Sequence, residues 1–143
     1  MATGPLLEEL SREECLRLLA TAPIGRISYT RQALPAVEPV NFALHDGTIV
    51  IRTDSGGKLA AAIRRAVVAF QADDLDPVLR SGWSVTVVGR CEEVTDAADL
   101  ARLETIVLES WAPGTRDNFI RIVPGIVTGR RLSGPEAQRT TGT

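Results

Sequence analysis

Short β-like segments separated by turn signals constrain this chain more than any other feature. Apolar and β-branched runs predict strands at residues 25–30, 35–44, 48–53, 66–72, 82–94, 119–123 and 126–132. Asp46-Gly47 is a typical hairpin signal between the second and third of them. Because helical patterns are few and short, we expect a mostly β fold of about six antiparallel strands, in a closed or nearly closed barrel rather than a βαβ sheet.

Two amphipathic patterns predict helices near the ends of the chain. The first covers residues 6–20, or begins at Ser11 after a short turn, because Ser11 and Glu14 form a capping box. The second covers residues 96–111, with Thr95 as its cap and one apolar stripe.

The middle of the chain predicts a short helix at residues 58–65 and then a strand. That strand, residues 66–72, is apolar at nearly every position, so we expect it to be buried on both faces. A polar loop is expected at residues 73–80. No linker or repeat divides the chain, so we predict a single domain over residues 6–132 and a polar, disordered tail over residues 133–143.

Composition narrows the classes of function. The formal net charge of −2 argues against a general nucleic-acid binder, and no apolar run reaches membrane-spanning length, so we expect a cytoplasmic protein. Cys15 and Cys91 are expected to be buried or half-buried thiols, and His45 a turn residue before Asp46-Gly47. With one histidine and no C-x-x-C motif, the sequence predicts no metal site.

The stretch from Val50 to Leu59 carries the strongest chemical signal. A β-like run ends in Thr53, and hydroxyls, two glycines and Lys58 follow at the start of a helical pattern. Such a combination suits a bound phosphate, although the spacing is neither that of a P-loop nor that of a dinucleotide-binding turn. A solvated strand-to-helix turn with Lys58 on the surface explains the local chemistry equally well.

The order of several short motifs along the chain resembles a known family. These motifs are Gly25-Arg-Ile27, Pro39-Val-Asn-Phe42, Asp46-Gly47, Arg52-Thr53, Gly57-Lys58, Gly89 and Glu92. They are similar to the pyridoxamine 5'-phosphate oxidase-like, FMN-binding split-barrel family, and in particular to its small flavin-reductase and nitroimidazole-reductase-like branch. The resemblance implies a six-stranded antiparallel split β-barrel of the FMN-binding type with short flanking helices. It also implies a homodimer with two FMN molecules in grooves at its interface.

The resemblance also assigns cofactor-binding residues. The family's strand end that binds flavin phosphate or ribityl oxygens corresponds to Arg52 and Thr53, and the following phosphate loop to Ser55, Gly57 and Lys58. The strand along the isoalloxazine edge corresponds to Pro39, Val40, Asn41 and Phe42, and the polar contact on the long strand to Ser84. With weaker support, the residues that reach the partner's flavin would be Trp111, Arg116 and Arg121.

Three functions stay open from the sequence. The first is an FMN-dependent oxidoreductase that acts on a small organic molecule. The second is a deazaflavin- or haem-binding protein of the same fold, and the third is a non-catalytic flavin-binding module. No nucleophile–base pair or carboxylate pair is visible, so any redox chemistry would belong to the cofactor. The short chain and the Arg130-Arg131-Leu132 segment depart from the vitamin B6 enzyme, and we expect the two arginines to be a solvated pair.

Overall fold

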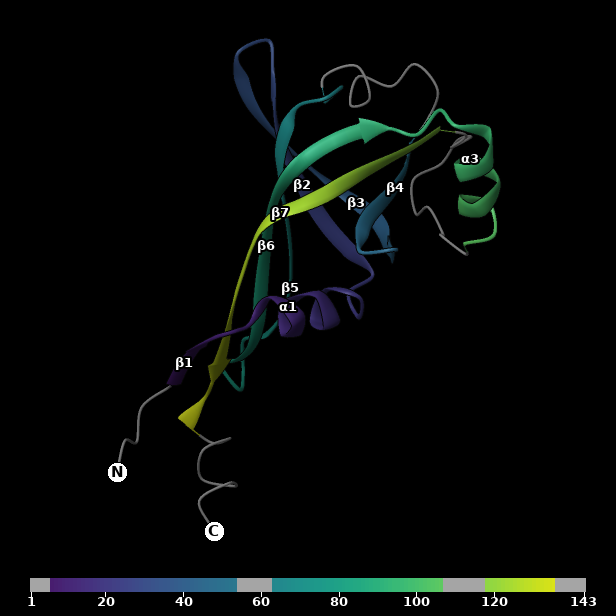
Figure 1. The fold of residues 1–143 in the computed structure, drawn as a ribbon. Coiled ribbons are helices and arrows are strands. Elements are labelled where there is room, and N and C mark those ends of the chain that lie inside the picture. Colours follow the sequence, from purple (N-terminus) through teal and green to yellow (C-terminus); the bar gives the residue numbers. More distant parts are fainter. Residues whose placement is uncertain (1–5, 54–62, 107–117, 136–143) are drawn as a thin grey trace.

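Six antiparallel strands form a closed ring in the computed structural model, which describes residues 6–53, 63–106 and 118–135 (Figure 1). The elements are β1 (Leu6–Glu9), α1 (Arg12–Leu19), β2 (Ile24–Arg31), β3 (Leu34–His45), β4 (Thr48–Thr53), β5 (Val67–Asp76), β6 (Ser81–Glu93), α3 (Ala97–Leu103) and β7 (Asn118–Ser133). The order around the ring is β7-β4-β3-β2-β5-β6, and the pairing of β6 with β7 closes it. The predicted six-stranded split barrel is therefore confirmed, and β1 adds a seventh strand beside β7.

The hairpin between β3 and β4 forms where the sequence predicts it. His45 pairs with Thr48, and the two residues between them have positive φ angles of 48° at Asp46 and 73° at Gly47. Positive φ at both central positions defines the turn whose twist matches that of the flanking strands. This turn fixes the register of β3 on β4.

The prediction of a helix over residues 6–20 is wrong at its start. Leu6–Glu9 is a strand that pairs antiparallel with residues 130–133 of β7. The helix begins only after Ser11, whose hydroxyl accepts the backbone N–H of Glu14 at 3.2 Å. The alternative start at Ser11 is therefore confirmed, and long-range pairing with β7 decides the conformation of the residues before it.

The second predicted helix also differs at its ends. Asp96, not Thr95, caps α3, and its carboxylate accepts the N–H of Asp99 at 3.0 Å. The α-helix covers Ala97–Leu103, and residues 104–106 continue it as turns. The remaining predicted positions, residues 107–111, lie outside the described residues.

β7 is a single strand where the sequence predicts two. Pro124-Gly125 does not end it. Pro124 pairs with Gly89 and Ile126 with Val88, so Gly125 is an extra residue at a β-bulge, and the pairing with β6 continues on both sides of it. A side chain at Gly89 would collide with the backbone carbonyl of Val123, which explains the glycine at this point. The result is a strand long enough to run from one end of the barrel to the other (Figure 1).

β5 corrects two predictions. It continues to Asp76, so the first half of the expected loop at residues 73–80 is strand. Its burial alternates: Phe70 is fully buried, whereas the side chain of Val67 is 66% exposed. Burial on both faces was expected, but the outer face of β5 lacks a covering layer at this end. The helix expected at residues 58–65 falls mostly outside the described residues, and residues 63–65 form a bend and a turn.

Side chains inside the ring form the main core, and a smaller cluster lies under α3. In the main core the rings of Phe42 and Phe70 meet edge to face, with centroids 4.7 Å apart. Cys15 and Leu19 of α1 belong to the same cluster, so this helix covers one part of the barrel. Leu103 belongs to the smaller cluster, together with residues of β4 and β7. None of the helices in the described residues is long and apolar enough to cross a membrane.

The barrel is split along one edge of β7, where a gap in strand pairing separates β4 from β1. β4 pairs with residues 118–122 on this edge, and β1 pairs with residues 130–133. Between the two, the Arg12 guanidinium donates to the carbonyls of Gly125 at 2.9 Å and Pro124 at 3.2 Å. The first residue of α1 thus provides partners for backbone groups that no strand reaches there.

Candidate functional site

The end of β4 holds a buried hydroxyl without a partner. Thr53 is 4% exposed, and its Oγ1 makes no hydrogen bond to any of the described residues. A buried hydroxyl normally finds a partner, because leaving it unpaired costs about 1–3 kcal/mol. An acceptor or donor supplied by a ligand at this strand end would satisfy it.

Arg52 lies on the opposite face of the same strand. Its guanidinium carbon is 5.2 Å from the centroid of the Phe119 ring, and one of its nitrogens is 3.9 Å from a carboxylate oxygen of Glu104. Successive side chains of a strand point to opposite faces, so Thr53 points inward and Arg52 outward under α3. The structure therefore does not bring these two predicted phosphate-binding side chains together.

The predicted residues of β3 divide in the same way. Val40 packs against the main core, and Phe42 is buried in it. Asn41 lies on the outer face, where its amide donates to the carbonyl of Pro23 at 3.3 Å. Because Phe42 pairs with Ile51, Asn41 lies level with Arg52 on that face. Pro39 is exposed two residues before it on the same face.

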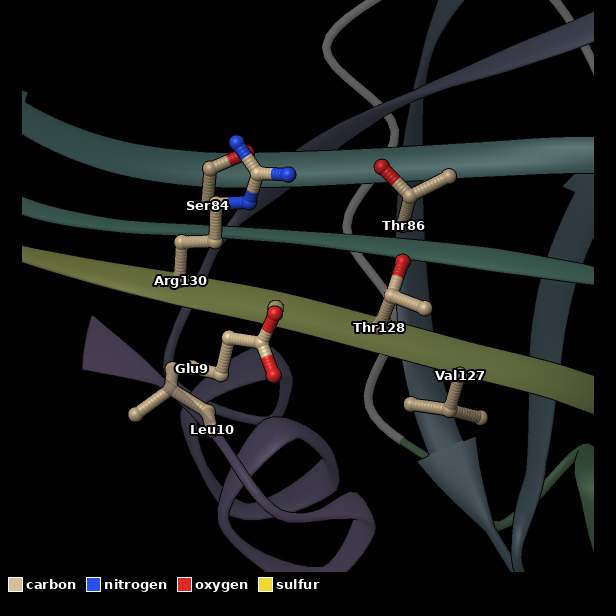
Figure 2. A pocket seen from close by; sticks show the side chains of 8 residues that line it. Glu9, Leu10, Ser84, Thr86, Val127, Thr128 and Arg130 are labelled. Atoms are coloured by element: carbon tan, nitrogen blue, oxygen red, sulfur yellow. The ribbon is translucent and has the colours of Figure 1, made fainter. Parts of the chain in front are cut away.

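Ser84 lies in a groove on the outer face of β6 and β7, beside β1. The groove has a volume of about 500 Å³ and is lined by Glu9, Leu10, Ser84, Thr86, Val127, Thr128, Gly129 and Arg130 (Figure 2). Thr86 and Thr128 are paired across the two strands, and so are Ser84 and Arg130. Three hydroxyls and one guanidinium thus face a cavity of the size that holds small organic ligands.

A polar chain connects this groove to the neighbouring strands. The Gln71 amide donates to Asp73 at 2.7 Å and lies 3.5 Å from the Ser84 hydroxyl. Arg26 in turn donates to Gln71 at 3.3 Å and lies 3.6 Å from Asp73. These contacts hold the Ser84 side of the groove in place from two further strands.

Arg130 and Arg131 were expected to be a solvated pair. Arg130 is exposed, as expected, whereas Arg131 is half-buried and points to the opposite face of β7. Arg131 donates to Glu14 at 3.1 Å, and the hydrogen bonds from Arg17 and, to a lesser extent, Arg131 lower the pKa of that carboxyl. Arg130 points to the other face and lines the groove. Within the described residues no hydrogen bond or ion pair joins it to another side chain.

The groove and the end of β4 are far apart within one chain. Thr53 pairs with Asn118 near the start of β7, whereas Ser84 pairs with Arg130 near its end. At about 3.3 Å per residue, these positions are about 40 Å apart along the strand. One small ligand cannot contact both ends of a single chain.

Arg121 lies neither in the Ser84 groove nor at the end of β4. It donates to Glu92 at 2.5 Å and lies 3.5 Å from Asp99, and the bond to Glu92 raises its pKa. It therefore ties α3 to the barrel within its own chain.

His45 lies 3.4 Å from Asp46 and borders a small cavity of about 70 Å³ beside Arg121. Five predicted site residues lie outside the described residues: Ser55, Gly57, Lys58, Trp111 and Arg116.

The expectation of buried thiols is confirmed. Cys15 and Cys91 are both 0% exposed and unpaired. Burial raises the pKa of Cys91 to about 12 and raises the pKa of Cys15 as well. Such thiols are poor nucleophiles near neutral pH, because the thiolate is the reactive form.

Sequence reasoning missed Glu9, Thr86, Thr128 and Arg130 as groove residues. A signal was present, since polar residues alternate on β6 at positions 84 and 86 and on β7 at positions 128 and 130. The register that places these two alternating pairs side by side follows only from the structure.

Comparison with known proteins decides the family. The model of the pyridoxamine 5'-phosphate oxidase family matches residues 11–131. The chain belongs to this family. It is 44% identical to the Mycobacterium tuberculosis protein Rv0080 over 129 residues, which cover 87% of this chain and 84% of that protein.

Two solved structures of similar sequence share the family fold. The FAD binding protein from Mycobacterium smegmatis is 36% identical, with a TM-score of 0.78, over 88% of this chain and 98% of that one. A crystal structure from Corynebacterium glutamicum is 32% identical, with a TM-score of 0.79, over 90% of this chain and 99% of that one. The suspected pyridoxamine 5'-phosphate oxidase-like split-barrel family is thereby confirmed.

Proposed function

We propose that this protein binds a flavin, either FMN or the FMN portion of FAD, and uses it in electron transfer with a small organic molecule. The observation that carries the proposal is the buried Thr53 hydroxyl without a partner, at the strand end that the family resemblance assigns to flavin oxygens. The Mycobacterium smegmatis relative, which is an FAD binding protein, supports the choice of a flavin.

The residues after Thr53 suit the phosphate of such a cofactor. A phosphate monoester carries close to two negative charges near pH 7, and charge-assisted bonds to it are the strong ones. We assign these bonds to Ser55, Gly57 and Lys58, which follow the strand in the sequence. Thr53, the last residue of β4, completes the set.

We propose a homodimer, in which one flavin contacts the end of β4 in one chain and the Ser84 groove of the other. The distance of about 40 Å between these places along β7 favours two chains over one. An apolar patch on the outer face supports association: Val67, Val123 and Ile126 are 66%, 45% and 64% exposed. Strand pairing brings the three near one another around Arg90: this residue pairs with both Val67 and Val123, and Val88, two residues before it on the same face of β6, pairs with Ile126. Exposed patches of this kind mark interaction sites.

The redox chemistry in this proposal comes from the cofactor. A bound flavin supplies hydride or single-electron transfer, and the protein supplies binding, orientation and electrostatics. Ser84 and its polar chain of Gln71 and Asp73 present hydrogen-bonding groups to the polar edge of the ring system. Trp111 and Arg116 are the candidate contacts to the partner's flavin.

The absorbance spectrum of the purified protein tests this proposal, followed by chromatography of the cofactor released on denaturation. We expect the two visible bands of oxidised flavin, and the chromatogram separates FMN from FAD. A blue-shifted deazaflavin band or a Soret band would replace the flavin by the corresponding alternative. A colourless protein that takes up neither FMN nor FAD in a titration would refute the proposal.

A further inference from the structure

The groove beside β1 is lined by one cationic and one anionic side chain, Arg130 and Glu9. We propose that it binds a small organic anion with a single negative charge, held by Arg130 and the hydroxyls of Thr86 and Thr128, next to the flavin edge at Ser84. This inference rests on the proposed function in one respect: the anion is taken to be the redox partner of the flavin. The binding site itself follows from the groove.

Arg130 supplies the cation for this site. Its guanidinium lies beside Ser84, and the hydroxyls of Thr86 and Thr128 stand next to one another on the same face (Figure 2). Its neighbour Arg131 is engaged with Glu14, whereas Arg130 has no such partner among the described residues. A planar guanidinium with hydroxyl donors around it is the arrangement that recognises a carboxylate.

Glu9 limits the charge of the ligand. It is the register partner of Arg130 and lines the same groove. No ion pair joins the two, although they are direct neighbours across β1 and β7, and the Arg130 guanidinium lies toward Ser84 instead (Figure 2). The Glu9 carboxylate would repel a second negative charge on the ligand, but it would not repel a neutral or hydrogen-bond-donating group at that end. The pair therefore selects a monoanion over a dianion.

Isothermal titration of the full-length protein, as purified, tests this with two probes of similar shape. Benzoate carries one carboxylate, and terephthalate carries a second one at the opposite end. We expect wild type to bind benzoate more tightly than terephthalate. We expect Arg130→Gln to weaken benzoate binding by about tenfold or more, as for the loss of a charge-assisted bond.

Two further variants make the test specific. Arg131→Gln removes the same charge from the adjacent residue on the other face of β7, and we expect it to leave benzoate affinity within about twofold, as for a site outside the groove. Glu9→Gln should improve the binding of terephthalate more than that of benzoate. Equal effects of Arg130→Gln and Arg131→Gln, no benzoate binding by wild type, or no gain for terephthalate in Glu9→Gln would each overturn the inference.

Flavin content separates this inference from the proposed function. We expect Arg130→Gln to retain its flavin spectrum while losing benzoate affinity. Loss of both would show that Arg130 serves the cofactor and would overturn the anion site. A protein that takes up neither FMN nor FAD in a titration but still binds benzoate through Arg130 would refute the flavin proposal and leave the anion site standing.

Discussion

Replacing Thr53 by valine should have opposite effects on the stability of the empty protein and on its affinity for flavin. The side chain is 4% exposed and its Oγ1 has no partner, so the folded protein bears the cost of an unpaired hydroxyl. Valine has nearly the same shape and no hydroxyl. Removing the unpaired group should therefore stabilise the flavin-free protein by about 1 kcal/mol or more. For a chain of this length that corresponds to a rise in Tm of about 4 °C.

The affinity of the Thr53→Val protein for flavin should fall. If Thr53 donates to an oxygen of the charged flavin phosphate, its loss should weaken binding by about 1.5–3 kcal/mol, or at least about tenfold in Kd. Thermal unfolding of the flavin-free protein and a flavin fluorescence titration measure the two effects. Thr30→Val, at an exposed position on β2, is the matched control and should change neither by more than about 0.5 kcal/mol. A less stable Thr53→Val protein, or one with unchanged flavin affinity, would refute the reasoning.

Three further predictions address the loop, the core and the dimer. Lys58→Ala should weaken FMN binding by about 1.5–3 kcal/mol in the same titration, whereas a merely surface lysine would leave it unchanged. Because burial raises the pKa of Cys91 from 9.0 to about 12, unfolding free energy should fall as pH rises through this interval, and Cys91→Ala should lessen that fall in denaturant titrations. Light scattering should show a dimer for wild type and a monomer for Ile126→Asp; a monomeric wild type would refute the interface.

Strand positions could be predicted because the signals are local. The alternation in β6 and the Asp46-Gly47 turn are properties of neighbouring residues, and the structure has both where they were expected. Residues 6–9 could not be predicted in this way, since their apolar positions suit a helix as well as a strand. Pairing with residues 130–133 decides between the two, and that contact spans almost the whole chain.

The candidate site was harder to predict because it depends on which face each side chain takes. Arg52 and Thr53 are adjacent in sequence, and so are Arg130 and Arg131, yet each pair divides between opposite faces of a strand. A motif of two adjacent polar residues in a strand therefore supplies only one of them to a given site. Sequence spacing alone does not say which one.

The proposed arrangement makes flavin binding and dimerisation one coupled equilibrium. If a single flavin contacts Thr53 of one chain and Ser84 of the other, it binds the dimer more tightly than the monomer. By linkage, flavin must then strengthen dimer association by the same factor, counted for each site, as dimer formation strengthens flavin binding. Ile126 lies on the apolar patch and outside the groove lining. The Ile126→Asp variant should consequently be monomeric and also bind flavin more weakly than wild type. A monomeric Ile126→Asp protein that binds flavin as tightly as wild type would show that one chain holds the whole cofactor site.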